Sequence, residues 1–266
     1  GRGAAGDVSP TVSRSDGTLP RAYDVVGVVK SPCGSGYGIT LDGKTLRTPG
    51  RNPLTMPTES LAYAVAAEWQ WQDTRTVQPL TMPMMTLAAT AIDIMPDQRH
   101  AVIGKLLEYF SGDPVVCRAP PQAHSKDLPA KQAAAFDPIA RWLSEDVLEG
   151  RNLQVTDSIF GVQQDEEVLW ALREKLDAYN NWELTALNSL SAAGRSVTLA
   201  LAVSEGRLTV REAIPLMRFD EEYQIAEWGL VEGGHDIDIA DTKVRIGAGS
   251  VFLKLLNDGP KDVPKQ

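Results

Sequence analysis

The sequence is poor in the residues that build disulfide frameworks and zinc sites. Its 266 residues include two cysteines, Cys33 and Cys117, which stand far apart. Two such cysteines do not organise a small disulfide-stapled fold, so we expect a reducing compartment. No HExxH or CxxC pair is present, and the histidines are scattered, which argues against a zinc site. The three histidines are His100, His124 and His235.

Long apolar runs and an excess of basic residues are also missing. No apolar run approaches the roughly 20 residues that a membrane-spanning helix requires. The formal net charge is -9, which argues against nucleic acid and anionic membrane surfaces as partners. There is no GxSxG nucleophile motif, and no pattern calls for a cofactor. Because the chain begins with Gly1 rather than Met, we expect that any targeting peptide has been removed.

What is present first is a strand-rich N-terminal part. Residues 1–20 are small, polar and aperiodic, which predicts a flexible lead-in. Residues 21–82 are expected to form a β-rich domain that includes the first helix. Within it, residues 36–47 predict a hairpin with Asp42-Gly43 as its two-residue turn, pairing Ile39 with Leu46.

The same hairpin contains a phosphate-loop pattern, Gly38-Ile-Thr-Leu-Asp-Gly-Lys-Thr45. A phosphate loop must open a helix, whose N-terminal amides hold the phosphate. Here the spacer residues are typical of a strand, and the continuation Leu-Arg-Thr-Pro-Gly does not begin a helix. We therefore interpret the segment as a plain hairpin, without nucleotide binding.

Helical periodicity dominates the rest of the chain. A helix at Met84–Met95 and a capping box at Thr209–Glu212 are expected, and Pro215 is expected to kink its helix only modestly. We assign 83–258 to a larger all-helical domain and 259–266 to a tail, so the predicted fold class is α+β. The further expected helices are 97–111, 129–148, 166–180, 181–192, 195–205, 209–228 and 238–256, with extended pieces at 114–119 and 153–158.

The first helix carries two tryptophans that point in different directions. Leu61, Val65 and Trp69 fall at i, i+4 and i+8 and form one apolar stripe. Trp71 lies roughly 200° from Trp69 around the helix, so at most one of them is expected in the core. The other is a candidate surface anchor. We predict Trp69 to be in the core.

An acidic segment closes the helical region. Between Phe219 and Thr242 there are eight acidic residues and no Lys or Arg. Asp220, Glu221 and Glu222 are consecutive, so they fan around a helix instead of stacking on one face. Two interpretations remain open: a solvated helix face, or a docking surface in which Trp228 and the glycines after it take part.

Four segments of the sequence resemble a known protein family. The segments LDGKTLRTP (41–49), AAEWQWQ (66–72), WELTALNSLSAAGRSVTLALAVSEGRLTVREA (182–213) and FDEEYQIAEWGLVEGGHDID (219–238) resemble the mitochondrial F1-ATPase assembly chaperone that handles the α subunit. The last two segments are the most specific, and the resemblance extends from about residue 23 to 256. The family usually has three consecutive glutamates where this chain begins with Asp220, which is one methylene shorter.

The resemblance implies a non-enzymatic, ATP-independent chaperone of the mitochondrial matrix. Its expected partner is the unassembled α subunit of F1 ATP synthase, and its expected fold is a small β domain followed by an orthogonal helical bundle. A monomer suits a transient holder of this kind. The resemblance places functional importance at Trp69 and the acidic cluster. The candidate client-binding residues are Asp220, Glu221, Glu222, Trp228, Glu232, His235 and Asp236.

A second hypothesis comes from another class of protein. Glu232, His235 and Asp236 could form a weak divalent-metal site in a small-molecule or metal-dependent hydrolase. A bound metal or a deep pocket lined by these side chains would favour that alternative. A shallow, acidic and partly apolar surface would favour the chaperone, and charge reversal at Glu221 or Glu222 would then impair client binding without unfolding the protein.

Overall fold

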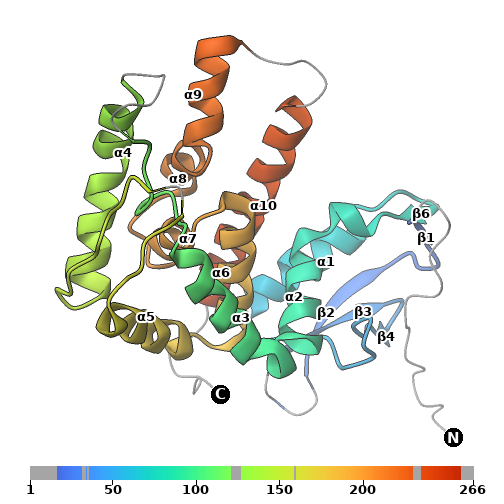
Figure 1. The fold of residues 1–266 in the computed structure, drawn as a ribbon. Coiled ribbons are helices and arrows are strands. Elements are labelled where there is room, and N and C mark those ends of the chain that lie inside the picture. Colours follow the sequence, from blue (N-terminus) through green and yellow to red (C-terminus); the bar gives the residue numbers. More distant parts are fainter. Residues whose placement is uncertain are drawn as a thin grey trace, which may run out of the picture. The chain divides into compact units, whose positions relative to one another are not determined.

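The computed structural model describes residues 17–31, 34, 36–120, 127–158, 160–229 and 235–258. It has a small N-terminal sheet and is mostly helical beyond it, so the fold is α+β (Figure 1). The chain divides into two compact units. Unit 1 contains residues 1–98, 181–185 and 251–266, and unit 2 contains residues 99–180 and 186–250. This division differs from the boundary expected between residues 82 and 83.

The sheet of unit 1 is antiparallel and its central strand is β3. β2 pairs with the whole of β3, β4 pairs with the end of β3, and β5 pairs with the beginning of β3. A separate pair joins β1 to β6, so the end of the expected flexible lead-in is a strand. The bounds are β1 Leu19–Pro20, β2 Val26–Lys30, β3 Tyr37–Leu41, β4 Lys44–Thr45, β5 Thr55–Met56 and β6 Thr76–Val77.

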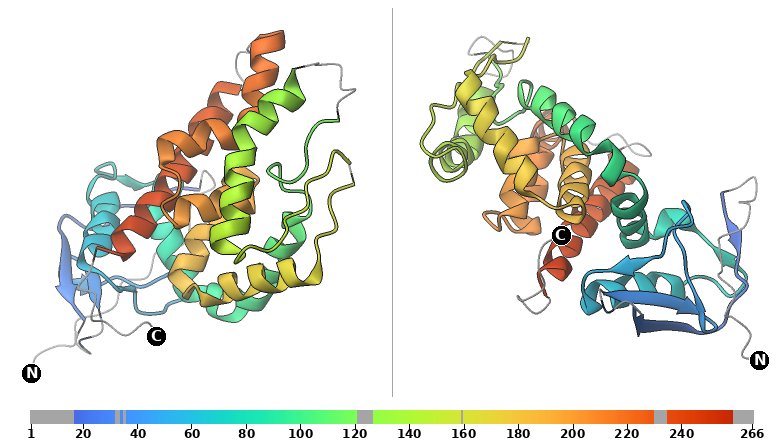
Figure 2. Two further views of the ribbon diagram at one scale, coloured as in Figure 1. Left: turned by 90° about the vertical axis from the view of Figure 1, so that its left-hand side faces the viewer. Right: turned by 90° about the horizontal axis from the view of Figure 1, so that it is seen from below.

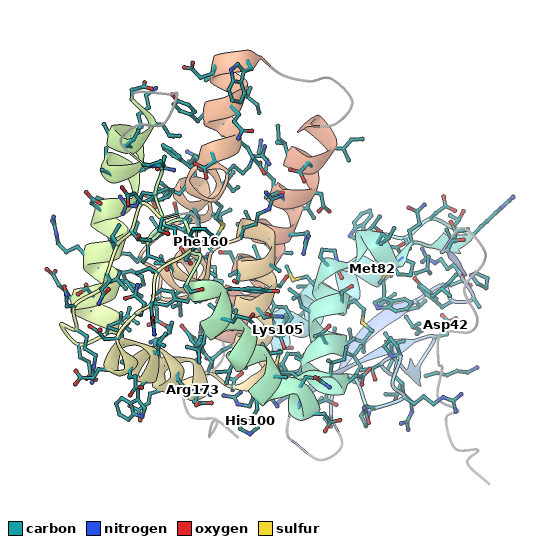
Figure 3. All side chains as sticks on the ribbon, in the orientation of Figure 1. Asp42, Met82, His100, Lys105, Phe160 and Arg173 are labelled. Carbon is teal, nitrogen blue, oxygen red and sulfur yellow. The ribbon has the colours of Figure 1, made fainter. Side chains whose placement is uncertain are left out.

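The turn between β3 and β4 confirms the predicted hairpin and its register. Thr40 pairs with Thr45, and the Leu46 amide donates to the Ile39 carbonyl at 2.8 Å. Asp42 and Gly43 have φ of 49° and 77°, the left-handed geometry of a type I′ turn. The Asp42 carboxylate, at the tip of the turn (Figure 3), accepts hydrogen bonds from the amides of Val25 and Asp24, which lower its pKa. The turn is followed by the strand β4, whereas a phosphate loop would be followed by a helix.

Helix α1 (Glu59–Gln70) covers the sheet as the apolar stripe predicts (Figure 2). Thr58 caps its N-terminus by accepting from the Leu61 amide, and the same hydroxyl donates to the Leu255 carbonyl at 2.7 Å. Trp69 is 5% exposed, whereas Trp71 is 85% exposed. The Trp69 ring packs edge-on against Tyr23 with centroids 5.7 Å apart, and the Tyr23 hydroxyl donates to the Trp69 carbonyl. Trp69 is therefore a core residue.

Glu68 caps the next helix of unit 1. After the 3-10 turn η1 (Pro79–Thr81), α2 (Pro83–Asp93) begins without a capping side chain of its own. The two Glu68 oxygens accept from the amides of Met84 and Met85, each at 2.8 Å. Burial outweighs these hydrogen bonds and raises the pKa of Glu68 to about 7. The Glu68 side chain thus joins α1 to the N-terminus of α2, although burial disfavours its ionised form.

Glu68 should make the stability of the protein depend on pH. Its pKa is about 7 in the fold against an ordinary value of 4.5, so the folded state binds the extra proton and stability falls as pH rises through this window. Relative to Glu68→Gln, the free energy of unfolding of the natural protein should fall by about 2 kcal/mol between about pH 5 and about pH 8. Urea unfolding at several pH values measures this. Parallel curves for the two proteins would contradict the prediction.

Unit 2 is built from helices around a fully buried one. Helix α7 (Val197–Ser204) is buried at every position from Val197 to Val203, as expected for a helix that is apolar on all sides. The other helices that lie wholly or partly in unit 2 are α3 (Met95–Phe110), α4 (Leu128–Trp142), the π-helical turn η2 (Leu143–Val147), α5 (Glu166–Ala178), α6 (Asn181–Gly194), α8 (Val210–Met217), α9 (Phe219–Trp228) and α10 (His235–Leu256). No helix in the described ranges is long and apolar enough to cross a membrane.

The loop after α3 is anchored at the N-terminus of α7. The buried Asp113 carboxylate accepts from the Ser196 hydroxyl at 2.9 Å and from the Thr198 amide at 2.9 Å. Burial raises the pKa of Asp113 despite these bonds. Beyond it, residues 114–116 form a turn instead of the expected extended start, and Cys117 then forms a single parallel bridge with Thr156 in the second expected piece. The anchor fixes the direction in which the 114–119 loop leaves the core.

The helix expected over 209–228 is broken in two, and this corrects the prediction. The capping box at Thr209 and Glu212 is present, but α8 ends at Met217 and α9 begins at Phe219. Between them, Arg218 has φ of -109° and ψ of 16°. Pro215 lacks an amide hydrogen, which weakens the last turn of α8. The buried Arg218 side chain stabilises this break through ion pairs with three carboxylates, so one expected helix becomes two.

Candidate functional site

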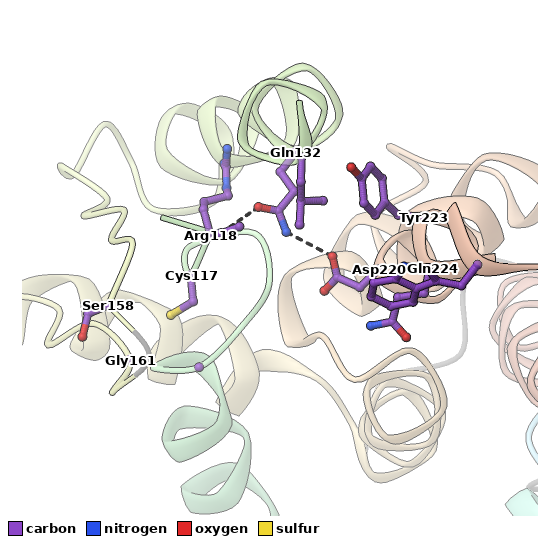
Figure 4. A pocket seen from close by; sticks show the side chains of 12 residues that line it. Cys117, Arg118, Gln132, Ser158, Gly161, Asp220, Tyr223 and Gln224 are labelled. Carbon is purple, nitrogen blue, oxygen red and sulfur yellow. Dashed lines mark hydrogen bonds between the residues drawn. The ribbon is translucent and has the colours of Figure 1, made fainter. Parts of the chain in front are cut away.

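A groove lies along one side of α9 in unit 2. Its volume is about 390 Å³, and it lies where α9 faces α4 and two loops (Figure 4). We call it the α4–α9 groove. It is lined by Gly112, Cys117, Arg118, Ala119, Leu128, Gln132, Ser158, Gly161, Asp220, Tyr223, Gln224 and Trp228.

A line of side-chain contacts joins α9 to α4. At the inner end, the rings of Phe136 and Phe219 pack with centroids 5.3 Å apart. Further out, the Tyr223 hydroxyl donates to Asp127 at 2.6 Å, and the Lys131 ammonium lies 5.0 Å from the Tyr223 ring. These contacts place α9 although it contains no buried residue. Because no residue of α9 is buried, much of the surface of this helix stays exposed.

Gln132 is the polar centre of the groove. Its side chain is on α4 and is 4% exposed. The amide oxygen accepts from the Ala119 amide at 2.8 Å, and the amide nitrogen donates to Asp220 Oδ1 at 3.0 Å (Figure 4). One buried side chain therefore sets the position of the 114–119 loop and of the Asp220 carboxylate together.

The loop wall of the groove carries little free charge. Arg118 forms an ion pair with Asp137 at 2.8 Å and donates to the Val115 carbonyl, and its side chain is 9% exposed. Burial raises the pKa of the Cys117 thiol, with a contribution from the negative charge of Asp113, so the thiol is neutral at physiological pH. The remaining charged lining side chain is Asp220, which gives the groove a negative electrostatic character.

The other side of α9 holds the remaining two acids of the consecutive cluster. Arg218 is 3% exposed and pairs with Glu221 at 2.9 Å, with Asp238 of α10 at 3.3 Å and with Glu222 at 3.4 Å. Arg195 lies 3.3 Å from the second oxygen of Glu221. Buried charges need partners of this kind to offset their desolvation. Glu221 thus stabilises the fold. We therefore no longer expect that reversing the charge of Glu221 would leave folding intact.

The structure separates the predicted site residues into groups. Asp220 and Trp228 line the α4–α9 groove, while Glu221 and Glu222 face Arg218. Glu232 lies outside the described residues. His235 and Asp236 begin α10, but their side chains lie outside the described part. In the described residues no group of three His, Cys, Asp or Glu side chains could hold a metal ion.

Several residues of the groove were missed by sequence analysis. Gln132 and Leu128 are almost a hundred residues from Asp220, and no local pattern distinguishes them from other residues of an amphipathic helix. Tyr223 lies inside the acidic segment, where no local pattern distinguishes it as a groove residue. Arg218 did carry a signal, because it precedes Glu221 and Glu222 by three and four residues, the spacing of intrahelical ion pairs.

The fold and the groove together define an α+β protein with an exposed, aromatic and acidic helix beside a groove. The family described as "ATP12 chaperone protein" matches residues 20–144. The crystal structure of Atp12 from Paracoccus denitrificans is 33% identical, with a TM-score of 0.79 over 89% of this chain and 98% of that one. The chain therefore belongs to the ATP12 chaperone family.

Curated relatives from two yeasts are more distant in sequence. "Protein atp12, mitochondrial" of Schizosaccharomyces pombe is 24% identical over 83% of this chain and 78% of its own length. "Protein ATP12, mitochondrial" of Saccharomyces cerevisiae is 23% identical over 80% of this chain and 77% of its own length. The family assignment thus extends along most of the chain, beyond the matched residues 20–144.

Proposed function

We propose that this protein is a client-specific holding chaperone for assembly of the F1 ATP synthase. It binds the unassembled α subunit, prevents its aggregation and releases it for assembly with the β subunit. It uses no ATP and catalyses no reaction. It works as a monomer in the mitochondrial matrix, in keeping with the mitochondrial names of the yeast relatives. Its helical part is an orthogonal bundle.

One observation carries the proposal: α9 contains no buried residue, yet it lines a groove with an exposed aromatic side chain. Trp228 is 78% exposed, and tryptophan is among the residues that contribute most to protein interfaces. An unassembled subunit exposes an interface that is apolar at its centre and charged at its rim. Trp228 supplies the apolar contact and Asp220 the charge in this proposal.

The other candidate residues have different parts in the proposal. Glu222 is 53% exposed despite its ion pair, so it can contact the client directly. Glu221 acts indirectly by holding Arg218 and thereby the position of α9. Glu232, His235 and Asp236 remain candidate client-binding residues in the proposal. Trp69 supports unit 1 from within its core.

The decisive experiment measures aggregation of purified F1 α subunit by light scattering. We expect this protein to suppress scattering at about a one-to-one ratio whether or not ATP is present, because exposed apolar surface is covered by binding alone. Trp228→Ala, which removes the exposed ring, should weaken suppression. Trp170→Ala, which removes another exposed indole that does not line the groove, serves as a matched control. Unchanged scattering with the natural protein would refute the proposal, and a requirement for ATP would refute its ATP-independent form.

A further inference from the structure

We propose that the α4–α9 groove binds an arginine side chain, which the client presents to it. The inference rests on the proposed function because it names the group that the groove takes from the client. It follows from the charge of the groove, from the order of side chains along α9 and from the size of the cavity.

The groove contains one carboxylate whose charge is not neutralised by a cation within the described ranges. Asp220 Oδ1 accepts a hydrogen bond from Gln132, which is a neutral amide. The nearby cations are committed elsewhere: Arg118 to Asp137 and Lys131 to Asp127. The second oxygen of Asp220 remains available to a cationic ligand. A carboxylate that is positioned by a buried amide is already oriented for a charge-assisted hydrogen bond.

The side chains along α9 match the shape of a guanidinium group. Asp220, Gln224 and Trp228 are spaced four residues apart, so they lie on one face of the helix, and all three line the groove. They offer a carboxylate, an amide oxygen and a flat indole. A guanidinium donates several hydrogen bonds in one plane and stacks on aromatic rings, whereas an ammonium group is a point charge with strong hydration. This combination favours arginine over lysine.

The cavity also fits a side chain better than a metal ion. Its volume is about 390 Å³, within the range of roughly 300–1,000 Å³ found for binding pockets of small organic groups. A hard divalent cation would require several carboxylate oxygens. Asp220 is the one carboxylate among the lining residues. Arginine is also common at protein interfaces, so an unassembled subunit can supply it.

A titration followed by NMR tests the inference on the full-length protein. The probes are N-acetyl-arginine amide, N-acetyl-lysine amide and the uncharged isostere N-acetyl-citrulline amide. We expect the arginine probe to shift the side-chain amide signals of Gln132 and Gln224 and the indole signal of Trp228. The lysine probe should bind at least about fivefold more weakly, and the citrulline probe should cause no shift. Equal shifts with lysine and arginine, or with citrulline and arginine, would overturn the inference.

Two variants make the test specific for the groove. Asp220→Asn keeps an acceptor for Gln132 but removes the charge, and it should weaken binding of the arginine probe about tenfold. Glu227→Gln removes one charge from the same helix outside the groove lining, and it should leave binding of the probe unchanged. Circular dichroism checks that both variants fold. Equal loss of binding in both would indicate a general charge effect and overturn the inference.

The aggregation assay separates this inference from the proposed function. If the natural protein and Asp220→Asn suppress aggregation of the α subunit equally, the holding function stands and the arginine contact is overturned. If the natural protein binds the arginine probe selectively but does not suppress aggregation, the proposed function fails and the arginine site stands. Support for both requires selective probe binding and weaker suppression by Asp220→Asn.

Discussion

Trp69→Arg should unfold unit 1 under conditions in which the natural protein is stable. Trp69 is 5% exposed and packs against Tyr23. Its indole nitrogen already has no hydrogen-bond partner in the structure, so the site offers no acceptor at that position for a guanidinium group. The change removes a large apolar side chain and buries an unpaired charge, and we expect a loss of about 4 kcal/mol or more in the free energy of unfolding. Thermal and urea unfolding followed by circular dichroism measure this.

Trp71→Arg is the matched control for this experiment. Trp71 is on the same helix end but is 85% exposed, so the same substitution should change stability by no more than about 0.5 kcal/mol. Similar melting curves for Trp69→Arg and the natural protein would contradict the core position of Trp69. Equal destabilisation in the two variants would show that arginine at this end of α1 is harmful for a reason other than burial.

Glu221→Lys should produce the second large effect, a destabilised turn between α8 and α9. The substitution removes a carboxylate 2.9 Å from the buried Arg218 and places a second positive charge beside it and Arg195. Removing one partner of a buried ion pair leaves the other charge without compensation. Since Asp238 and Glu222 still pair with Arg218 and Glu221 is partly exposed, we expect a loss of about 3 kcal/mol. Urea unfolding followed by circular dichroism measures the loss.

Glu227→Lys controls for a change of net charge on the same helix. Glu227 is exposed and forms no ion pair within the described residues, so its reversal should leave stability within about 0.5 kcal/mol of the natural protein. If Glu221→Lys were as stable as Glu227→Lys, then Glu221 would not be a structural residue. The original expectation, that its charge reversal affects client binding alone, would then be correct.

The two tryptophans show how far a local pattern predicts burial. Helical periodicity placed Trp69 on the apolar stripe and Trp71 away from it, and the structure confirms both positions. Periodicity alone was sufficient to predict burial here because the sheet covers one side of the first helix, and the apolar stripe lies on that side. Pairing in the β3–β4 hairpin was predictable for a similar reason, since Asp42-Gly43 favours a single two-residue turn.

The acidic segment shows where local patterns end. The sequence predicted three neighbouring acids on one helix, but it did not predict that Asp220 meets Gln132 while Glu221 meets Arg218. The two contacts lie on different sides of α9, and they separate a groove residue from a structural one. The separation depends on the turn at Arg218 and on the position of α4, both of which are tertiary features.

The sequence by itself determined most of the helices, the hairpin, the core position of Trp69 and the resemblance to a chaperone family, because these depend on periodicity, turn chemistry and residue identity. Only the tertiary structure decided which acids line a groove, where the helix expected over 209–228 turns, and that Glu68 caps the following helix. Such contacts join residues that are distant along the chain. Their energy depends on burial and on the partners that burial brings together, and neither is recorded in the local pattern of residues.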